Sequence, residues 1–425
     1  MSKTKTPIIE VNTSKYRQGR GQCEIHVGDA FDRLRLLPDE CIHTCITSPP
    51  YYGLRDYGED DQIGLEETPE EYVVNLVAVF REVRRVLRDD GTLWLNLGDS
   101  YGKDKQLVGI PWRVAFALQQ DGWYLRQDII WHKPNPMPES VTDRCTNAHE
   151  HVFLLSKSKR YYYDHEAIKG AAKHKHTGKV GDRNKGTGKA RSAGGLKAPD
   201  RSGNFKPVDE KRNKRDVWTI TPGKYSEAHF ATYPPDLVEP CILAGTSQHG
   251  ACAECGAPFE REVNRTKATP RQKQGYTANC GARNDGDRPG SFSGHNSETI
   301  GWQKACDCAN PTPKSCVVLD PFAGSGTTGA VATDHGRDAF LIELNPEYAE
   351  LAKKRVAEYE PEIKALDFSE NMVETLEAIA NGQNDDHHWS TLRALRRRDL
   401  IGEDDELLIG RSEALGICRW WRSNG

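Results

Sequence analysis

A glycine-rich turn between a short apolar run and a helix-like segment limits the folds open to this chain. The run Val317–Leu319 is typical of a buried strand, and residues 327–334 after the turn are typical of a helix. Glycines at 324 and 326 let the backbone approach a ligand, and the helix N-terminus offers free N–H groups. Such a turn can also be purely structural, so the residues that flank it decide how it is interpreted.

Two acidic residues flank the turn and indicate the kind of ligand. Glu343 follows Gly324 by nineteen residues and ends the next predicted strand, where a carboxylate can bind both ribose hydroxyls. Asp320 ends the strand before the turn, where it would repel a pyrophosphate but suits the amino group of a methionine moiety. The turn lacks the Gly-Lys-Ser/Thr ending of a phosphate-binding loop, which disfavours ATP.

Strand-like and helix-like segments alternate along much of the chain. Apolar and β-branched residues predict strands over 23–29, 42–47, 92–97, 125–131, 316–319 and 338–342. Apolar spacings of three and four predict helices over 69–87, 114–119, 236–244, 327–334 and 345–359, and Asp90-Gly91 suggests a turn. This alternation predicts an α/β fold with a doubly wound, mostly parallel sheet.

The tetrapeptide Ser48-Pro49-Pro50-Tyr51 follows one of these strands. It could be a simple proline turn. Its chemistry also suits an exocyclic amino group, because the Ser48 Oγ and the Pro49 carbonyl can accept that group's two hydrogens. The lone pair is then freed for attack, and fixed prolines supply the acceptors without reorganisation. The Tyr51 ring can stack on a base flipped out of the duplex.

Together these motifs resemble the β class of DNA amino-methyltransferases, in which the catalytic motif precedes the cofactor motif. Segments His26–Asp29, Trp131–Pro136, His149–His151 and Phe230–Thr246 also resemble that family. The resemblance covers roughly residues 22–165 and 217–360. It implies a Rossmann-like, S-adenosylmethionine-dependent methyltransferase fold with two insertions, acting on double-stranded DNA.

The resemblance also assigns site residues. Ser48, Pro49, Pro50 and Tyr51 would bind the base, and the cofactor residues would be Asp29, Asp320, Pro321, Phe322, Gly324, Gly326, Thr327 and Glu343. A serine at the first tetrapeptide position favours cytosine N4, with adenine N6 as the alternative. No Pro-Cys dipeptide occurs, so a cysteine nucleophile of the carbon-5 type is not expected.

Two insertions interrupt the family pattern. Residues 169–215 hold fifteen basic residues against four acidic ones, which suits phosphate contacts and target recognition, although a solvated loop would look similar. The second insertion contains Cys252-Ala-Glu-Cys255 and Cys306-Asp-Cys308, a zinc-ribbon-like set suited to structural zinc. His249 and Cys280 are possible substitute ligands.

The expected organisation follows from these boundaries: 22–164 forms the catalytic half of the core, 165–216 the basic insertion and 217–249 a core segment. Residues 250–315 form the zinc insertion, 316–366 the cofactor half and 367–425 a C-terminal extension of uncertain role. The net charge of −4, with no apolar run of membrane-spanning length and no signal-like N-terminus, favours a cytoplasmic protein without a membrane partner.

Three rival functions stay open from the sequence. The chain could be a non-catalytic, zinc-containing DNA-binding module, or it could methylate RNA or a small molecule; the basic insertion disfavours the last. Such a methyltransferase would be expected to serve a restriction-modification system, and any restriction nuclease would then be a separate chain. The oligomeric state is not indicated by any pattern.

Overall fold

The computed structural model describes residues 8–11, 21–54, 62–171, 211–223, 233–266, 296–359 and Thr375. The chain divides into two compact units, residues 1–359 and 360–425. All helices and strands described below belong to the first unit. The predicted boundary at residue 366, most of the basic insertion, Cys280 and almost all of the C-terminal extension lie outside the described residues.

Alternating strands and helices build a nine-stranded sheet in the order β1-β2-β15-β14-β3-β4-β6-β5-β9. Neighbours from β2 to β4 pair in parallel, whereas β1 and β6 run antiparallel to their neighbours. The strands are β1 (Ile8–Val11), β2 (Cys23–Val27), β3 (Ile42–Thr47), β4 (Leu87–Leu97), β5 (Tyr124–His132), β6 (His149–Ser156), β9 (Val217–Thr219), β14 (Val317–Asp320) and β15 (Asp338–Glu343). The predicted doubly wound, mostly parallel sheet is therefore confirmed.

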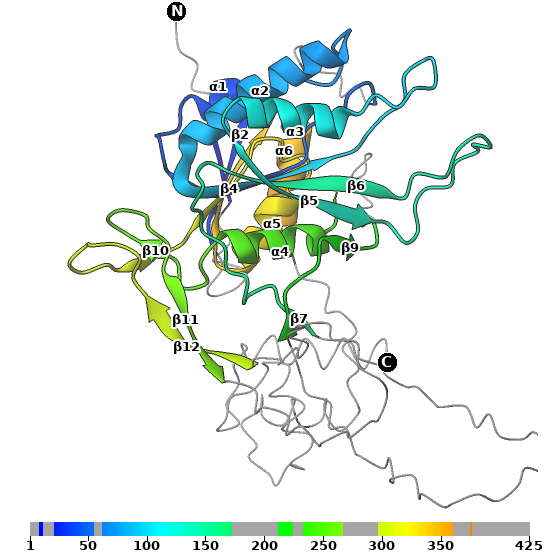
Figure 1. Ribbon diagram of the computed structural model, residues 1–425. Helices are drawn as coiled ribbons and strands as arrows, with labels where there is room; N and C mark the ends of the chain where they lie inside the picture. The colour runs from blue at the N-terminus through cyan, green and yellow to red at the C-terminus, as the bar shows by residue number, and fades with distance from the viewer. Residues whose placement is uncertain are drawn as a thin grey trace, which may run out of the picture. The chain divides into compact units, whose positions relative to one another are not determined.

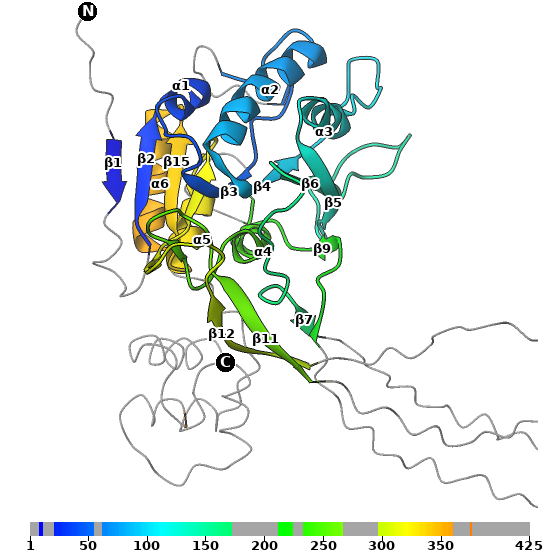
Figure 2. The ribbon, with the colours of Figure 1, turned by 60° about the vertical axis from the view of Figure 1, so that its left-hand side comes forward.

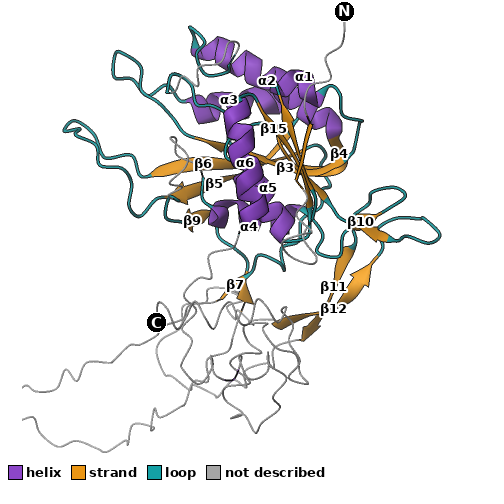
Figure 3. Ribbon diagram, turned by 180° about the vertical axis from the view of Figure 1, so that it is seen from behind, coloured by secondary structure: helices purple, strands orange, loops and turns teal. Residues whose placement is uncertain are grey.

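Helices cover both faces of this sheet, as Figures 1 and 2 show. One face carries α1 (Ala30–Leu34), α2 (Pro69–Val86) and α3 (Ile110–Gln120), and the other carries α4 (Pro235–Gly245), α5 (Thr327–Asp334) and α6 (Pro346–Glu358). Seen from behind, α4, α5 and α6 lie together over their face (Figure 3). Each helix buries an apolar stripe against the strands, so two hydrophobic cores sandwich the sheet.

Local signals explain where several helices begin. Thr68 caps α2 in a reciprocal capping box with Glu71, and Pro69 occupies the first turn. The Asn345 side chain accepts hydrogen bonds from two backbone N–H groups at the start of α6. Helix α4 continues through Pro240, although proline cannot donate the backbone hydrogen bond of that turn.

Two expectations about the centre of the sheet need correction. Asp90-Gly91 is not a turn but lies inside β4, which begins directly after α2. A side chain at Gly91 would come within 3.1 Å of the Leu87 side chain and of the backbone carbonyls of Arg88 and His43, so glycine here serves close packing. Strand β6, which inserts antiparallel between β4 and β5, was also not expected from the sequence.

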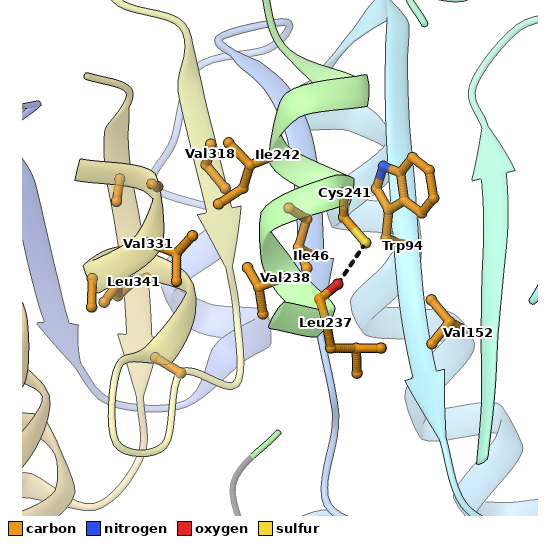
Figure 4. Packing of buried hydrophobic residues seen from close by; sticks show 14 of the residues in the cluster. Ile46, Trp94, Val152, Leu237, Val238, Cys241, Ile242, Val318, Val331 and Leu341 are labelled. Carbon is orange, nitrogen blue, oxygen red and sulfur yellow. Dashed lines mark hydrogen bonds between the residues drawn. The ribbon is translucent and has the colours of Figure 1, made fainter. Parts of the chain in front are cut away.

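Helix α4 shows how the second core is built. Its residue Ile242 lies toward Val318 and Val238 toward Val331, while the Cys241 sulfur lies near Trp94 on β4 (Figure 4). The Cys241 thiol donates to the Leu237 carbonyl one turn earlier, and burial raises its pKa. This cysteine is therefore a core residue, as expected from its apolar context.

Small two-stranded sheets extend from the core. They are β7 (Gly170–Ala171) with β8 (Lys211–Arg212), β10 (Ala251–Cys252) with β13 (Pro313–Lys314), and β11 (Glu260–Thr266) with β12 (Asn296–Gln303). Figure 1 shows β10, β11 and β12 projecting beyond the sheet. Among the described residues, no helix is both long and apolar enough to cross a membrane.

Candidate active site

A cavity of about 750 Å³ lies where the parallel strands of the sheet end. The segments after β2, β3, β4, β5, β14 and β15 line it, together with the first residues of the antiparallel β6. This is the edge at which open α/β sheets bind ligands, and the volume is in the usual range for small-molecule sites. The predicted site residues that line it are Asp29, Ser48, Pro49, Pro50, Tyr51, Pro321, Phe322, Gly324, Thr327 and Glu343.

The two glycines of the turn have different reasons for being glycine. Both have positive φ angles, +52° at Gly324 and +79° at Gly326. A side chain at Gly324 would meet nothing within 4 Å, so this position borders open space. A side chain at Gly326 would lie 2.7 Å from the Ala352 Cβ on α6. Gly324 thus keeps the cavity open, whereas Gly326, which does not line it, lets α5 and α6 pack closely.

Glu343 lies at the end of β15 with its carboxylate against the glycine turn. One oxygen accepts from the Gly324 N–H at 2.7 Å, and the other accepts from the Asn345 N–H at 3.0 Å. Burial raises the pKa of this carboxyl from 4.5 to about 7, although both N–H groups oppose that shift. The end of β15 therefore presents the Glu343 carboxylate to the cavity, beside the turn that follows β14.

Asp320 lies behind the cavity wall and does not line it. The side chain is completely buried, and its carboxylate accepts from Thr47 at 2.6 Å and from Thr328 and Tyr233 at 2.7 Å each. Burial raises its pKa, and these donors lower it. The carboxylate thus fastens the end of β3 to the start of α5. A ligand's amino group could reach it only by replacing one of these hydrogen bonds.

The tetrapeptide after β3 is held rigidly from behind. The Tyr72 hydroxyl on α2 donates to the Pro50 carbonyl at 2.8 Å. Among the described residues, no donor contacts the Pro49 carbonyl. A side chain at Gly98 would lie 2.7 Å from the Tyr51 ring, so glycine after β4 makes room for that ring. Ser48 and Pro49 both line the cavity.

A polar network that the sequence analysis did not predict surrounds Tyr51. Its hydroxyl accepts from the Ser48 hydroxyl at 3.2 Å and donates to Glu150 Oε2 at 2.7 Å. The Asn96 amide nitrogen lies 2.8 Å from the Tyr51 oxygen and 2.9 Å from the same Glu150 oxygen. Lys133 pairs with the other Glu150 oxygen and lies over the Trp131 ring. Burial raises the pKa of Tyr51 well above its usual value.

These additional residues come from strands whose ends are distant in sequence. Asn96 is near the end of β4, Lys133 follows β5, and Glu150 is near the start of β6. The segments around Lys133 and Glu150 were noted for their family resemblance, but no role could be assigned to either residue. The antiparallel insertion of β6 beside β4 brings Glu150 to Tyr51 and Asn96, and no local sequence pattern indicates that contact.

The four predicted metal ligands come together in a separate cluster. The sulfur atoms of Cys252, Cys255, Cys306 and Cys308 all lie within 4.8 Å of one another. Tetrahedral zinc with Zn–S bonds near 2.3 Å needs sulfur atoms roughly 3.8 Å apart, so the set fits with small adjustments. His249 instead stacks on Trp302 and is not a member of the cluster.

The loop of Cys252 and Cys255 is anchored on strands of the main sheet. The Arg88 guanidinium donates to the Cys255 carbonyl at 2.7 Å, and His43 Nε2 lies 3.0 Å from the Gly256 carbonyl. His43 Nδ1 accepts from the Val317 N–H, so Nε2 carries the proton and donates. Burial lowers the pKa of His43 to about 4, which keeps the ring neutral. The cysteine loop thus contacts β3 and β4 directly.

The arrangement suits a reaction between two bound molecules. Carboxylates at Asp29 and Glu343 flank one part of the cavity, where hydroxyl-bearing groups can bind. Another part of the cavity has a polar wall, where a hydrogen-bond donor of a bound molecule can be accepted. This wall is formed by Ser48, Tyr51, Asn96 and Glu150. Holding two reactants in one cavity is a major source of rate enhancement in group transfer.

Comparison with known proteins identifies relatives over most of the chain. The family model described as "DNA methylase" matches residues 42–253 and 310–354. The unmatched residues 254–309 lie inside the predicted cysteine insertion. The type II methyltransferase M.SmaI of Serratia marcescens is 37% identical over 362 residues, covering 79% of this chain and 90% of that protein.

A second relative agrees with this match, and one solved structure is reported with it. The type II methyltransferase M.Cfr9I of Citrobacter freundii is 36% identical over 357 residues, covering 77% of this chain and 86% of its own. The solved structure of the PvuII DNA methyltransferase, described as cytosine-N4-specific, aligns with 80% of this chain and 88% of its own. That alignment has a TM-score of 0.47 and 18% sequence identity.

Proposed function

The chain belongs to the family of S-adenosylmethionine-dependent DNA methylases that modify cytosine N4 or adenine N6, and we propose that its target is cytosine N4. The observation that carries the proposal is that Ser48 and the glycine turn with Glu343 line one cavity. A base amino group beside Ser48 would thus face a cofactor bound near Glu343. The preference for cytosine rests on serine, rather than an acid or asparagine, at the first tetrapeptide position.

Each of the chain's own residues has a proposed task. Glu343 accepts the two ribose hydroxyls, and Asp29 binds nearby on the adenosine side. Ser48 and the Pro49 carbonyl accept the hydrogens of the amino group. Tyr51 borders the base. When bound, S-adenosylmethionine supplies an activated methyl group. Pro321, Phe322 and Thr327 shape the cofactor wall, while Asp320 and Gly326 support it from behind.

A product analysis tests the proposal. Purified protein is incubated with duplex DNA and methyl-labelled S-adenosylmethionine, and the nucleosides are analysed by mass spectrometry. We expect labelled N4-methylcytosine. Labelled N6-methyladenine would replace the base assignment, and label in RNA alone would refute DNA as the substrate. Ser48→Ala should lower the rate at least roughly 100-fold without loss of cofactor binding, whereas Ser158→Ala, remote from the cavity, should behave as wild type.

The cysteine cluster is proposed to hold one structural zinc ion. Four sulfur ligands leave no open coordination position, so the metal would stabilise the insertion rather than react. Elemental analysis of the purified chain should find about one zinc per molecule. Cys306→Ser should lose the metal and lower the melting temperature, while Cys145→Ser, an exposed cysteine outside the cluster, should keep both. The site would be refuted if removing zinc from the wild-type protein left its melting temperature unchanged.

The basic insertion, residues 165–216, is proposed to recognise the target sequence. Its excess of lysine and arginine suits phosphate contacts, whose release of counterions makes binding strongly dependent on salt. Deletion of residues 172–210 should weaken DNA binding and flatten its salt dependence, with cofactor affinity retained. Unchanged DNA affinity in the deletion would assign recognition elsewhere. A companion nuclease on a separate chain is the expected partner of such a type II enzyme.

A further inference from the structure

We propose that Glu150 is the final acceptor of the proton that the target amino group loses, and that the proton travels through the Ser48 and Tyr51 hydroxyls. The inference rests on the proposed function, since it requires an exocyclic amino group beside Ser48. It applies equally to cytosine N4 and adenine N6.

The hydrogen bonds of the three residues point in one direction. Ser48 Oγ donates to Tyr51 Oη at 3.2 Å, and Tyr51 Oη donates to Glu150 Oε2 at 2.7 Å. The serine hydrogen is directed toward Tyr51, and the Asn96 amide donates to Ser48 Oγ at 3.3 Å. Because a hydroxyl oxygen has two lone pairs, the second one is left to accept a hydrogen from the cavity. A continuous series of hydrogen bonds thus connects the base site to the Glu150 carboxylate.

The chemistry of the reaction requires such an outlet. The base nitrogen bonds to the methyl carbon as the methyl–sulfur bond breaks, and that electron pair stays with sulfur. The nitrogen then carries a positive charge and must lose a proton. A serine hydroxyl is a weak base, so it cannot retain that proton. In the proposed relay, Ser48 takes it and passes its own hydrogen to Tyr51, which passes its hydrogen to Glu150.

This sequence balances charge as well as atoms. The sulfonium charge and the Glu150 carboxylate charge are both present before transfer. After transfer, a neutral thioether, a neutral methylated base and a protonated Glu150 remain. Ser48 and Tyr51 end as they began, each with one hydroxyl hydrogen.

The surroundings of Glu150 suit a terminal acceptor. Lys133 pairs with Oε1, so Oε2 is the oxygen that faces Tyr51 and Asn96. Burial raises the pKa of Tyr51, so the phenol is disfavoured as a resting anion and suits passing a proton onward. Asn96, nearly buried, holds both the tyrosine and the carboxylate in line. Glu150 acts through Tyr51 and is therefore a positioning residue rather than one that contacts the base.

A structural role is the competing explanation, because the Glu150–Lys133 pair also joins β6 to the end of β5. The two explanations differ in how the effects of substitutions at Tyr51 and Glu150 combine. A relay requires the ionised carboxylate, and the rate falls to the same extent whether the hydrogen bonds are interrupted at Tyr51 or at Glu150. A brace between strands would be insensitive to the Tyr51 hydroxyl.

The test measures single-turnover methylation of duplex DNA at saturating cofactor. Glu150→Gln and Tyr51→Phe should each lower the rate roughly 100-fold or more, the usual contribution of a positioned acid or base. The double variant should be no slower than the slower single one, because both cut the same path. Glu150→Asp should recover part of the rate.

The controls separate this inference from its premise. Glu350→Gln, on the exposed face of α6, should match wild type. Cofactor affinity shows that each variant is folded; if Glu150→Gln does not fold, Tyr51→Phe alone must show the loss of rate. Wild-type rates in Glu150→Gln or Tyr51→Phe, or multiplicative losses in the double variant, would overturn the relay. Wild-type protein that forms no methylated base would instead refute the proposed function.

Discussion

Lowering the pH should weaken cofactor binding through one carboxyl group, Glu343. Its two oxygens accept hydrogen bonds from backbone N–H groups of the glycine turn and the start of α6, and burial raises its pKa to about 7. An ionised carboxylate can accept both ribose hydroxyls, whereas a protonated one loses an acceptor site. The cofactor should therefore bind preferentially to the ionised form.

The magnitude follows from that pKa. With a pKa of about 7, roughly one molecule in eleven is ionised at pH 6 and roughly ten in eleven at pH 8. If only the ionised form binds, Kd should be roughly tenfold higher at pH 6 than at pH 8, equivalent to about 1.4 kcal/mol. Folding stability should fall as the pH rises, whereas cofactor binding strengthens. Because the Glu343 pKa is raised in the folded state, its contribution to the free energy of unfolding is lost as the pH rises from about 4.5 to about 7.

Isothermal titration calorimetry with S-adenosylhomocysteine at several pH values measures the effect. Glu343→Gln should bind more weakly at pH 8, by roughly ten- to a hundredfold for the loss of charge-assisted hydrogen bonds, and without pH dependence. Glu347→Gln, two residues after Asn345 and exposed, should keep the wild-type profile. A wild-type Kd that is constant between pH 6 and 8 would refute the reasoning.

Three further substitutions test the packing that positions the site. Gly326→Ala should lower the free energy of unfolding by about 1–3 kcal/mol in urea melts, because it strains a positive φ and collides with Ala352; unchanged stability would contradict the close helix packing. Thr68→Ala should cost about 0.5–2 kcal/mol through loss of the capping box with Glu71, and Thr68→Ser should restore most of it. Phe80→Ala should cost about 3–5 kcal/mol in the same melts, since the ring is completely buried; a smaller loss would indicate that the core collapses around the vacancy.

Much of the fold could be predicted from local patterns. The apolar spacing predicted α2 and its buried stripe, because helix periodicity acts within a few residues. Alternation of strands and helices predicted the parallel sheet. The turn predicted at Asp90-Gly91 was wrong, because tertiary pairing of β4 with β3 and β6 overrides the local turn preference.

The candidate site was predicted in the same uneven way. Motifs whose function depends on consecutive residues, the tetrapeptide at Ser48 and the glycine turn before Thr327, were recognised from the sequence. The cysteine pairs were also recognised, since ligand spacing is a local property, and their sulfur atoms do come together. Gly326 and Asp320 were assigned to the cofactor, yet both support the wall from behind.

The sequence by itself determined the alternating elements, the chemistry available at each strand end and the metal-ligand spacing, because these depend on neighbours along the chain. The tertiary structure decided which side chains meet. Antiparallel β6 places Glu150 beside Asn96 and Tyr51, and the buried Asp320 joins β3 to α5. Such contacts depend on strand order and direction, which are set by packing of the whole sheet rather than by any segment of it.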